Sequence, residues 1–414
     1  MSSRQDRAGR PETAYVWIWL PAAAEPIPAG RLDQVGESLV FRYGRLYLER
    51  PDAIAIYEPE LPLVPGEQVP AADTIHGCIA DAGPDSWGQR VILHELGGEG
   101  ADPGPLTYLL ASGSDRIGAL DFQPSAAEYV PREAGAASLE DLLAAAEHVE
   151  EGTPLPPALS AALLRGTSIG GARPKALLDE GERRWIAKFS STTDAYPVVQ
   201  AEFVAMRLAR LAGLNAARVE IAEALGKKVL LVERFDRPPA GGRRAMVSAL
   251  TILGLGQAGG RYGSYAELAQ VVRARFTDPD ATLRELFGRI AFNILTSNTD
   301  DHPRNQAAFW DGNELMLTPA YDITPCPRSG GEAEQVMAIG EDGWRYSQLA
   351  GCVARSAAYH LGEAAARELV DRQVDAIRDN WHDVCDEAGL TRTERDSLWE
   401  RQFLNPFAFL DSHS

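Results

Sequence analysis

The stretch that decides the fold reads TSNTDDHPRNQAAFWDGNELMLTPAYDITP and spans residues 296–325. A helix is expected before it, with Asp278 as its cap and Pro279 at its first position. Apolar residues recur on one face of that helix, at Leu283, Leu286, Phe287, Ile290 and Ile294. The helix should end near residues 296–298 and deliver residues 300–305 into a loop. The Asp311-Gly312 pair between apolar runs then predicts a β-hairpin that ends at Asp322.

This order of helix, aspartate-rich loop, hairpin and aspartate fits phosphoryl transfer from ATP. One carboxylate must orient the substrate hydroxyl, while an amide and a second carboxylate hold Mg²⁺. Protein kinases place four residues between the catalytic aspartate and the metal-binding asparagine. Asp300 stands at that distance from Asn305, whereas Asp301 is one residue too close. Taken alone, the loop fits a helix-terminating turn equally well, but Asp322 favours the kinase interpretation.

A lysine on a strand supplies another part of this interpretation. Lys188 lies in the apolar run WIAKF, and the segment 197–212 is predicted to form an amphipathic helix. Kinases use a strand lysine on the ATP phosphates and pair it with a carboxylate of the next helix. Glu202 is the natural partner here. By itself, a lysine on a strand is more often a solvated edge residue.

Two further segments could contact a nucleotide. Residues 166–175 read GTSIGGARPK, and glycines let backbone N–H groups approach a phosphate closely. The segment matches neither of the common glycine-rich phosphate motifs, so its generic signal is weak. Residues 233–236, ERFD, end a predicted strand where the two lobes of a kinase would join, and backbone groups there can bind adenine. A simple strand end is an equally good interpretation.

The whole chain has the composition of a soluble globular protein. Of its 414 residues, 45% are hydrophobic and 24% charged. A formal net charge of −19 argues against a broad nucleic-acid surface. The four cysteines form no Cys-x-x-Cys pair, which fits a reducing cytosol without disulfides or zinc. The apolar stretch 16–24 is short and interrupted by Pro21, so we expect a cytoplasmic protein without a signal peptide or membrane partner.

An α+β fold follows from the distribution of periodic segments. Short strands are predicted for YVWIWLP, LVFRYG, LYLE, AIAIYEP and GALDFQP, all before residue 125. Helices are predicted at 86–96, 105–110 and 138–151, and a hairpin at 175–189. We divide the chain into an N-terminal α+β domain (1–125), a connecting helix and linker (126–160), a β-rich ATP-binding part (161–238) and a helical catalytic lobe (239–414).

Several segments together resemble the HipA-like serine/threonine kinases, the toxins of bacterial toxin–antitoxin pairs. They are SIGGARPKALL (168–178), WIAKF (185–189), VERFDR (232–237), NTDDHPRN (298–305) and LTPAYDITP (317–325). ADAGPDSWGQR (80–90) and SDRIGALDF (114–122) look like the N-terminal domain of that family, so nearly the whole chain is covered. The resemblance implies a two-lobed protein-kinase-like fold with a small N-terminal α+β domain and a mostly helical C-terminal lobe.

The resemblance also implies roles for individual residues. Asp300 would be catalytic, and Asn305 and Asp322 would bind Mg²⁺. Residues Ile169, Gly170, Gly171, Ala172, Arg173, Lys188, Glu233, Phe235 and His302 would bind or support ATP. Ser168 matches the serine that the family autophosphorylates, a change that ejects the phosphate loop and silences the kinase. Asp301 and Arg173 depart from the family pattern, in which glycine and glutamine occur.

The leading hypothesis is therefore a kinase toxin that phosphorylates a translation-related protein. Members of the family target aminoacyl-tRNA synthetases, but the target differs between members and this sequence does not name it. Its implied partner is a small helix-turn-helix antitoxin (HipB-like) that contacts operator DNA on its behalf. A second hypothesis is a catalytically silent co-repressor, against which Lys188, Asp300, Asn305 and Asp322 argue. A third is a kinase of small molecules or lipids, because these enzymes share the two-lobed scaffold.

Overall fold

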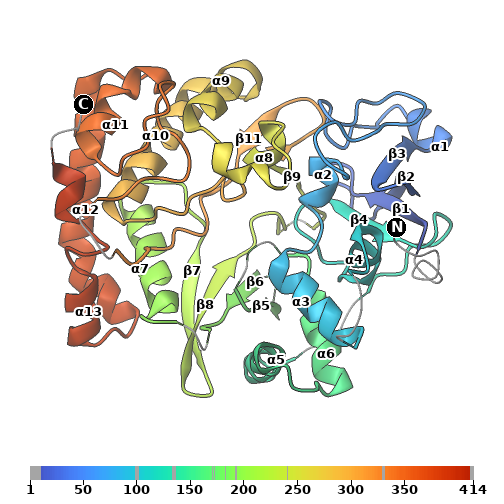
Figure 1. Ribbon diagram of the computed structural model, residues 1–414, viewed down its shortest axis with the longest axis horizontal. Coiled ribbons are helices and arrows are strands. Elements are labelled where there is room, and N and C mark those ends of the chain that lie inside the picture. The colour runs from blue at the N-terminus through green and yellow to red at the C-terminus, as the bar shows by residue number, and fades with distance from the viewer. Residues whose placement is uncertain are drawn as a thin grey trace. The chain divides into compact units, whose positions relative to one another are not determined.

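The computed structural model describes residues 11–97, 102–132, 137–169, 171, 173–181, 183–191, 194–239, 241–328 and 332–410 (Figure 1). The chain forms two compact units. The first unit comprises Met1–Ala187, Asp236–Val247 and Trp310–Asn313. The second unit comprises Lys188–Phe235, Ser248–Phe309 and Glu314–Ser414. The predicted combination of helices with short antiparallel strands is confirmed in both units.

The first unit contains an antiparallel sheet with strand order β3-β2-β1-β4. Its strands are β1 (Thr13–Ile18), β2 (Ile27–Val35), β3 (Ser38–Tyr43) and β4 (Leu120–Gln123). The register places Val16 opposite both Gly30 on β2 and Phe122 on β4. Val16 and Phe122 are fully buried, so the alternation that predicted these strands marks the face that packs into the core.

Two predicted strands in this unit are wrong. LYLE belongs to the short helix α1 (Arg45–Leu48), in which only Tyr47 is buried and Leu46 is exposed. AIAIYEP forms no strand, because tyrosine hydroxyls replace a partner strand. The hydroxyl of Tyr47 donates to the carbonyl of Ile54 (2.7 Å), and the N–H of Ile56 donates to the hydroxyl of Tyr43 (2.9 Å). Backbone groups of a buried segment need such partners wherever a sheet does not provide them.

Helices and a strand pair complete the first unit. The helices are α2 (Gly77–Ala80), α3 (Ser86–Glu95), α4 (Pro105–Ala111), α5 (Leu139–Glu151) and α6 (Pro157–Arg165). α5 begins with a capping box, in which Ser138 and Asp141 bond each other's backbone N–H groups. The neighbouring strands β5 (Lys175–Glu180) and β6 (Arg183–Lys188) confirm the hairpin predicted over 175–189. Strand β9 (Ala245–Ser248) follows later in the chain.

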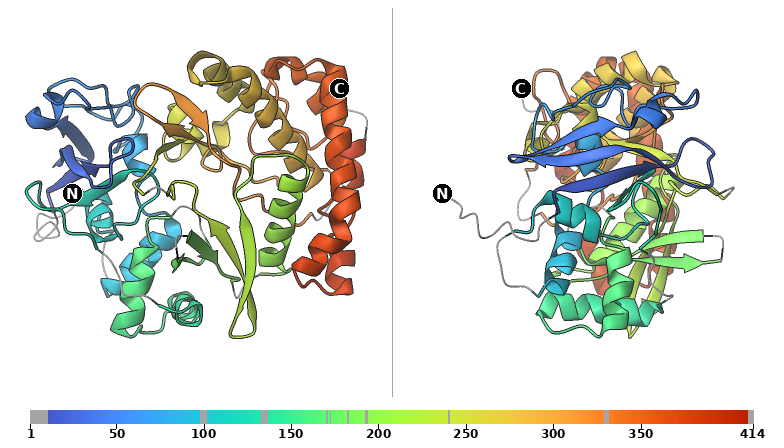
Figure 2. Two further views of the ribbon diagram at one scale, coloured as in Figure 1. Left: turned by 180° about the vertical axis from the view of Figure 1, so that it is seen from behind. Right: turned by 90° about the vertical axis from the view of Figure 1, so that its right-hand side faces the viewer.

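The second unit begins at the end of β6 and continues into α7 (Val198–Leu211). The antiparallel strands β7 (Val219–Ala224) and β8 (Lys227–Glu233) follow, and α7 contacts both of them. α7 also packs against α12 (Glu363–Glu387), which runs alongside it (Figure 2). Ten of the fourteen residues of α7 are buried, so this helix is held from several sides.

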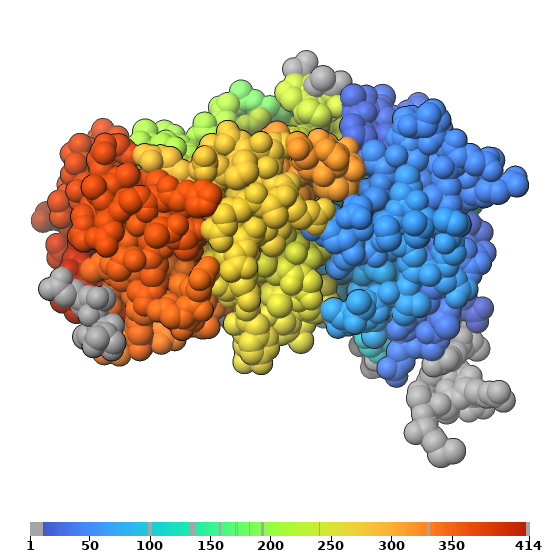
Figure 3. Space-filling model, turned by 90° about the horizontal axis from the view of Figure 1, so that it is seen from above, coloured from blue at the N-terminus to red at the C-terminus, as the bar shows by residue number. Residues whose placement is uncertain are grey.

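The core of the second unit forms around α10 (Pro279–Leu295). Asp278 caps this helix by accepting from the N–H of Ala281 (3.2 Å), as predicted. α10 contacts α9 (Tyr265–Arg275), α12 and the 3-10 helix η3 (Ser356–Tyr359). Residues of α9 and η3 contact each other, and the golden-yellow surface in Figure 3 belongs to the part of the chain around α9. These contacts on several sides fix the end of α10, and with it the loop that follows.

The remaining elements of the second unit are short apart from these helices. They are α8 (Ala249–Ile252), η2 (Gly259–Tyr262), β10 (Ala307–Trp310), β11 (Leu315–Leu317), α11 (Leu349–Ala354), α13 (Arg392–Leu398) and η4 (Pro406–Phe409). β10 and β11 confirm the hairpin predicted after the aspartate-rich loop. Among the helices described, none has the length and apolar character that a bilayer span requires. The functional boundaries at 125, 160 and 238 stay predictions.

Candidate active site

Lys188 is the centre of a charged cluster in the second unit. Its Nζ lies 2.6 Å from Oε1 of Glu202 on α7 and 2.5 Å from Oδ1 of Asp322. The pairing with Glu202 was predicted from the sequence, and it is confirmed. Burial alone would lower the pKa of Lys188, but the carboxylates of Asp322 and Glu202 outweigh burial and raise that pKa above its ordinary value. The lysine is therefore held as a cation between two carboxylates.

Asp322 has an unusual backbone conformation. Its φ is +59°, in the left-handed region that residues other than glycine rarely adopt. Such conformations cost free energy and tend to collect at functional sites. The preceding residue, Tyr321, donates its hydroxyl to the carbonyl of Arg304 (2.7 Å). This bond ties the segment that carries Asp322 to the loop that carries Asn305.

The loop after α10 presents its polar residues differently. The side chain of Asp300 is exposed, while Asn305 is buried. A turn holds the loop closed, because the N–H of Asn305 donates to the carbonyl of His302 (2.8 Å). Nδ1 of His302 is buried and has no hydrogen-bond partner among the residues described. The exposed carboxylate of Asp300 is accessible to a substrate, as a general base must be. The buried amide of Asn305 is held in place, as a metal ligand must be.

Asp301 anchors this loop to the core, a role that the sequence did not reveal. It is 2% exposed, and its Oδ2 accepts from Asn293 Nδ2 (2.8 Å), Gln306 Nε2 (2.9 Å) and the hydroxyl of Tyr265. Burial raises the pKa of Asp301, and the hydrogen bonds from Tyr265 and Gln306 partly oppose that shift. Neighbouring aspartates thus have opposite environments, one facing solvent and one buried.

The anchor extends into a wider polar network on α10. Arg289 Nη1 donates to Oε1 of Gln306 (3.2 Å), and Asn298 Nδ2 donates to Oδ1 of Asn293 (3.0 Å). Both ends of the loop, at Asn298 and Gln306, are thereby fixed to the same helix. Because buried polar networks of this kind lose free energy when any member is left unpaired, they hold one loop geometry.

The predicted adenine-binding segment lies at the end of β8. The N–H of Glu233 donates to the carbonyl of Arg218 (2.9 Å). The ring of Phe235 packs against Phe309 and Tyr321, at centroid distances of 5.9 and 5.8 Å. Tyr321 is the residue that bonds Arg304, so this segment is joined through two contacts to the aspartate-rich loop. The second unit therefore brings together Lys188, Phe235, Asn305 and Asp322, each within one or two contacts of the next.

The predicted phosphate loop belongs to the first unit. Ser168 is fully buried, and its Oγ donates to the carbonyl of Gly113 (3.2 Å). Lys175 is also buried, and its Nζ bonds Oδ2 of Asp85 (2.8 Å) and the carbonyl of Gly171. Gly171 has a φ of +114°, which only glycine adopts without strain. Ile169 is buried and Arg173 partly exposed, whereas Gly170 and Ala172 lie outside the described residues.

The donor set fits a magnesium nucleotide. Mg²⁺ prefers oxygen ligands, which the carboxylate of Asp322 and the amide oxygen of Asn305 offer. No group of three or more His, Cys, Asp or Glu side chains in the described part of the chain is arranged to hold a metal alone. A magnesium ion that comes with a nucleotide needs only one or two protein carboxylates, because phosphates and water complete its shell.

Comparison with known proteins first defines the fold. The structure of HipA in complex with HipB and operator DNA, from Shewanella oneidensis MR-1, superimposes with a TM-score of 0.69 and 21% identity. The match covers 93% of this chain and 98% of that one. The fold is thus the kinase-like, two-lobed α+β fold that the sequence predicted. Residues 167–381 match the family described as the HipA-like C-terminal domain, and residues 20–123 match the HipA N-terminal domain.

The chain belongs to the HipA-like family. It is 26% identical over 292 residues to a serine/threonine-protein kinase toxin HipA of Shewanella oneidensis, a match that covers 64% of this chain and 66% of that protein. It is 31% identical over 149 residues to a putative kinase, Y4mE, of Sinorhizobium fredii, covering 33% of each. The chain therefore spans just under two thirds of the first relative and one third of the second.

Proposed function

We propose that this chain is an ATP-dependent serine/threonine protein kinase. The observation that carries the proposal is the position of Lys188 between Glu202 and Asp322. Protein kinases need both a lysine paired with a helix carboxylate and an aspartate at the metal. A buried cation costs free energy unless it is paired, and here both partners belong to that set. Membership of the HipA-like family supports the same activity.

Each residue of the cluster then has a role. Lys188 orients the nucleotide phosphates, Asn305 and Asp322 hold Mg²⁺, and the magnesium ion supplies charge neutralisation at the phosphates when bound. Asp300 accepts the proton of the substrate hydroxyl, for which its exposed carboxylate is suited. The backbone of Glu233 and Phe235 binds adenine, and His302 supports the loop. Ile169, Gly170, Gly171, Ala172 and Arg173 contribute the phosphate loop.

Membership of the HipA-like family also supports a biological role. We propose that the kinase is the cytoplasmic toxin of a toxin–antitoxin pair and phosphorylates a translation-related protein, such as an aminoacyl-tRNA synthetase. Its partner is a HipB-like helix-turn-helix antitoxin, which supplies the contacts to operator DNA. The net charge of −19 supports this division of labour, because an acidic chain is repelled by phosphates. Autophosphorylation of Ser168 silences the enzyme.

The test is phosphoryl transfer by the purified full-length chain. With ATP–Mg²⁺ labelled at the γ-phosphate and a host lysate, the wild type should label itself and a small set of proteins. Asp300→Asn should abolish both signals. Asp311→Asn is the matched control, because Asp311 lies in the exposed hairpin turn and should leave labelling unchanged. Label on small molecules alone would refute the protein-kinase assignment, and no transfer at all would favour a silent co-repressor.

A further inference from the structure

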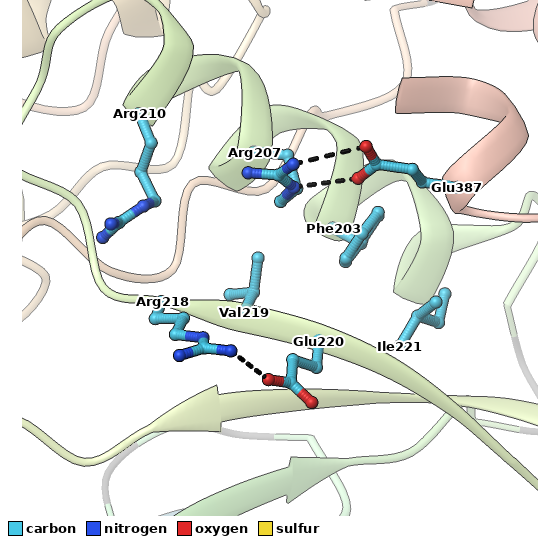
Figure 4. Close-up of a pocket in the computed structure, with 8 residues that line it drawn as sticks. All are labelled: Phe203, Arg207, Arg210, Arg218, Val219, Glu220, Ile221 and Glu387. Carbon is cyan, nitrogen blue, oxygen red and sulfur yellow. Dashed lines mark hydrogen bonds and ion pairs between the residues drawn. The ribbon is translucent and has the colours of Figure 1, made fainter. Parts of the chain in front are cut away.

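A second site lies between α7 and β7, within the second unit. It is a cavity of about 610 Å³, a size that suits a small molecule, since ligand pockets span roughly 300–1,000 Å³. Its lining comes from α7, from β7 with the residue before it, and from the last residue of α12 (Figure 4). The lining residues are Phe203, Arg207, Arg210, Arg218, Val219, Glu220, Ile221 and Glu387.

The cavity carries more positive than negative charge. Three arginines line it against two glutamates. Arg207 binds Glu387 through two bonds (2.9 and 3.3 Å), and Arg218 binds Glu220 (2.7 Å). Arg210 donates to the carbonyl of Ala216 (2.7 Å), and it makes no ion pair within the described part of the chain. An excess of guanidinium groups is unexpected in a chain with 59 acidic and 40 basic residues.

The floor of the cavity is apolar. Phe203 and Val219 are each 4% exposed; in Figure 4, Val219 lies between Arg207 and Arg218, and Phe203 lies beside Arg207. A guanidinium group can bind two phosphate or carboxylate oxygens at once. An apolar floor favours a ligand with an apolar or aromatic body. Inorganic anions would use only the first of these features. The lining therefore selects an organic anion with at least two acidic oxygens.

We propose that this cavity binds a small organic phosphate or polycarboxylate, and that the ligand regulates the Lys188–Glu202 pair. The structural link is α7 itself. Glu202 directly precedes Phe203, and Arg207 follows one turn later on the same helix. An anion that binds Arg207 competes with Glu387, and so changes the tie between α7 and the end of α12. Because coupling between two sites is reciprocal, nucleotide and anion must alter each other's affinity by the same factor.

The binding part of this proposal is tested by calorimetry on the full-length protein. The probes are phenyl phosphate, citrate and inorganic phosphate. Phenyl phosphate or citrate should bind more tightly than inorganic phosphate, and the preferred probe identifies the ligand class. Arg210→Ala should weaken binding about tenfold, whereas Glu387→Gln should strengthen it, because it removes a competing carboxylate. Arg210→Lys should give an intermediate loss.

Two controls make the result decisive. Arg284→Ala removes one exposed arginine from α10, outside the cavity, and should leave the affinity unchanged. Lys188→Met separates the cavity from the nucleotide site, because it should weaken nucleotide binding and spare probe binding. Equal affinities in the wild type and Arg210→Ala, or loss of the probe in Lys188→Met, would overturn the proposal. So would the absence of binding by all three probes.

The regulatory part rests on the roles proposed above for Lys188 and Glu202. Nucleotide affinity should change when the preferred probe is present at saturation, and Arg210→Ala should abolish that change while keeping nucleotide affinity without the probe. An unchanged nucleotide affinity in the wild type would overturn the coupling. The two failures are distinguishable, because calorimetry of the probe does not depend on phosphoryl transfer. If the protein showed no kinase activity but still bound phenyl phosphate at Arg210, the proposed function would fail while the proposed binding site would stand.

Discussion

The hydroxyl of Tyr265 donates a hydrogen bond to the carboxylate of Asp301, the residue that directly follows the proposed catalytic Asp300. This bond joins α9 to a loop that begins at the end of α10. Since Asn293 and Gln306 bond the same oxygen of Asp301, three donors converge on one buried acceptor. The loop is thus positioned from its second aspartate, and its first is left exposed.

Tyr265→Phe should therefore weaken both stability and catalysis. It removes one donor from a buried carboxylate, a loss that costs about 1–3 kcal/mol of unfolding free energy. We expect a lower rate of phosphoryl transfer with little change in nucleotide affinity, because the loop shifts while the Lys188 cluster stays. Denaturant unfolding and steady-state kinetics measure the two effects. Tyr262→Phe is the control, since Tyr262 is 78% exposed. Equal stability and equal transfer rates in the two variants would contradict the role of Tyr265 in anchoring the loop.

The burial of Asp301 also predicts a pH dependence of stability. Its pKa in the folded protein is raised above the ordinary value of 3.8. The unfolded chain therefore ionises first as pH increases, and the contribution of this group to stability is present below 3.8 and lost as pH rises through the folded-state pKa. Asp301→Asn cannot ionise and lacks this loss.

The stability difference between wild type and Asp301→Asn should accordingly shift in favour of the variant as pH increases from about 4 to 7. Thermal unfolding at several pH values measures that difference, and the constant effect of altered hydrogen bonds cancels in the comparison. Asp311→Asn, an exposed change of the same kind, should show no such trend. A difference that stays constant, or that shifts toward the wild type, would exclude a raised pKa at Asp301.

The sequence predicted the parts of the site that depend on chain order. Asp300 and Asn305 follow a helix whose cap and apolar face are local signals, and Lys188 and Glu202 sit on a strand and on the helix after it. These features need only periodicity and spacing. A strand was predicted in place of helix α1, because in so short a segment a single buried residue, Tyr47, also fits the alternation of a strand.

Contacts between distant residues could not be predicted in this way. Asp301 meets Tyr265 across 36 residues, and Lys188 meets Asp322 across 134. No local pattern specifies which buried donor will reach a given carboxylate, because the packing of α9 against α10 determines it. The arginines of the cavity similarly come from α7 and from the residue before β7. Only the folded chain places them around one cavity.

Lys188 offers a test that separates stability from function. Lys188→Met leaves Glu202 buried without its cation, which should cost about 3–5 kcal/mol of unfolding free energy. It should also weaken nucleotide binding at least tenfold, since the phosphates lose their cation. Adding Glu202→Leu should restore much of the stability, because the buried carboxylate is then removed and only the partly exposed Asp322 has lost Lys188, but it should not restore nucleotide affinity.

Unfolding free energies and nucleotide titrations on the single and double variants measure both quantities. The exposed pair Lys228–Glu223, 2.9 Å apart on neighbouring strands, is the control. Lys228→Met should change stability by less than about 1 kcal/mol, as for other surface ion pairs, and should leave nucleotide affinity unaltered. Recovery of nucleotide binding in the Lys188→Met/Glu202→Leu variant would show that Lys188 has only a structural role.

The proposed phosphorylation of Ser168 conflicts with the buried position of that residue. It is fully buried, and a phosphate dianion cannot remain in such a site without charged partners. Phosphorylation therefore requires the segment to leave its place first. The bonds of Lys175 to Asp85 and to the carbonyl of Gly171 oppose that movement.

Asp85→Asn should therefore accelerate phosphorylation of Ser168. Asp85 caps α3 by accepting from the N–H of Gly88 (2.8 Å), and asparagine caps equally well, so the change removes chiefly the charge that faces Lys175. Mass spectrometry of Ser168 at intervals after mixing with ATP–Mg²⁺ measures the rate, and Ser168→Ala should keep the kinase active. Asp141→Asn, at the cap of α5, is the control. A main phosphorylated site elsewhere would disprove this mechanism of self-silencing. Equal rates of Ser168 phosphorylation in the wild type, Asp85→Asn and Asp141→Asn would disprove it as well.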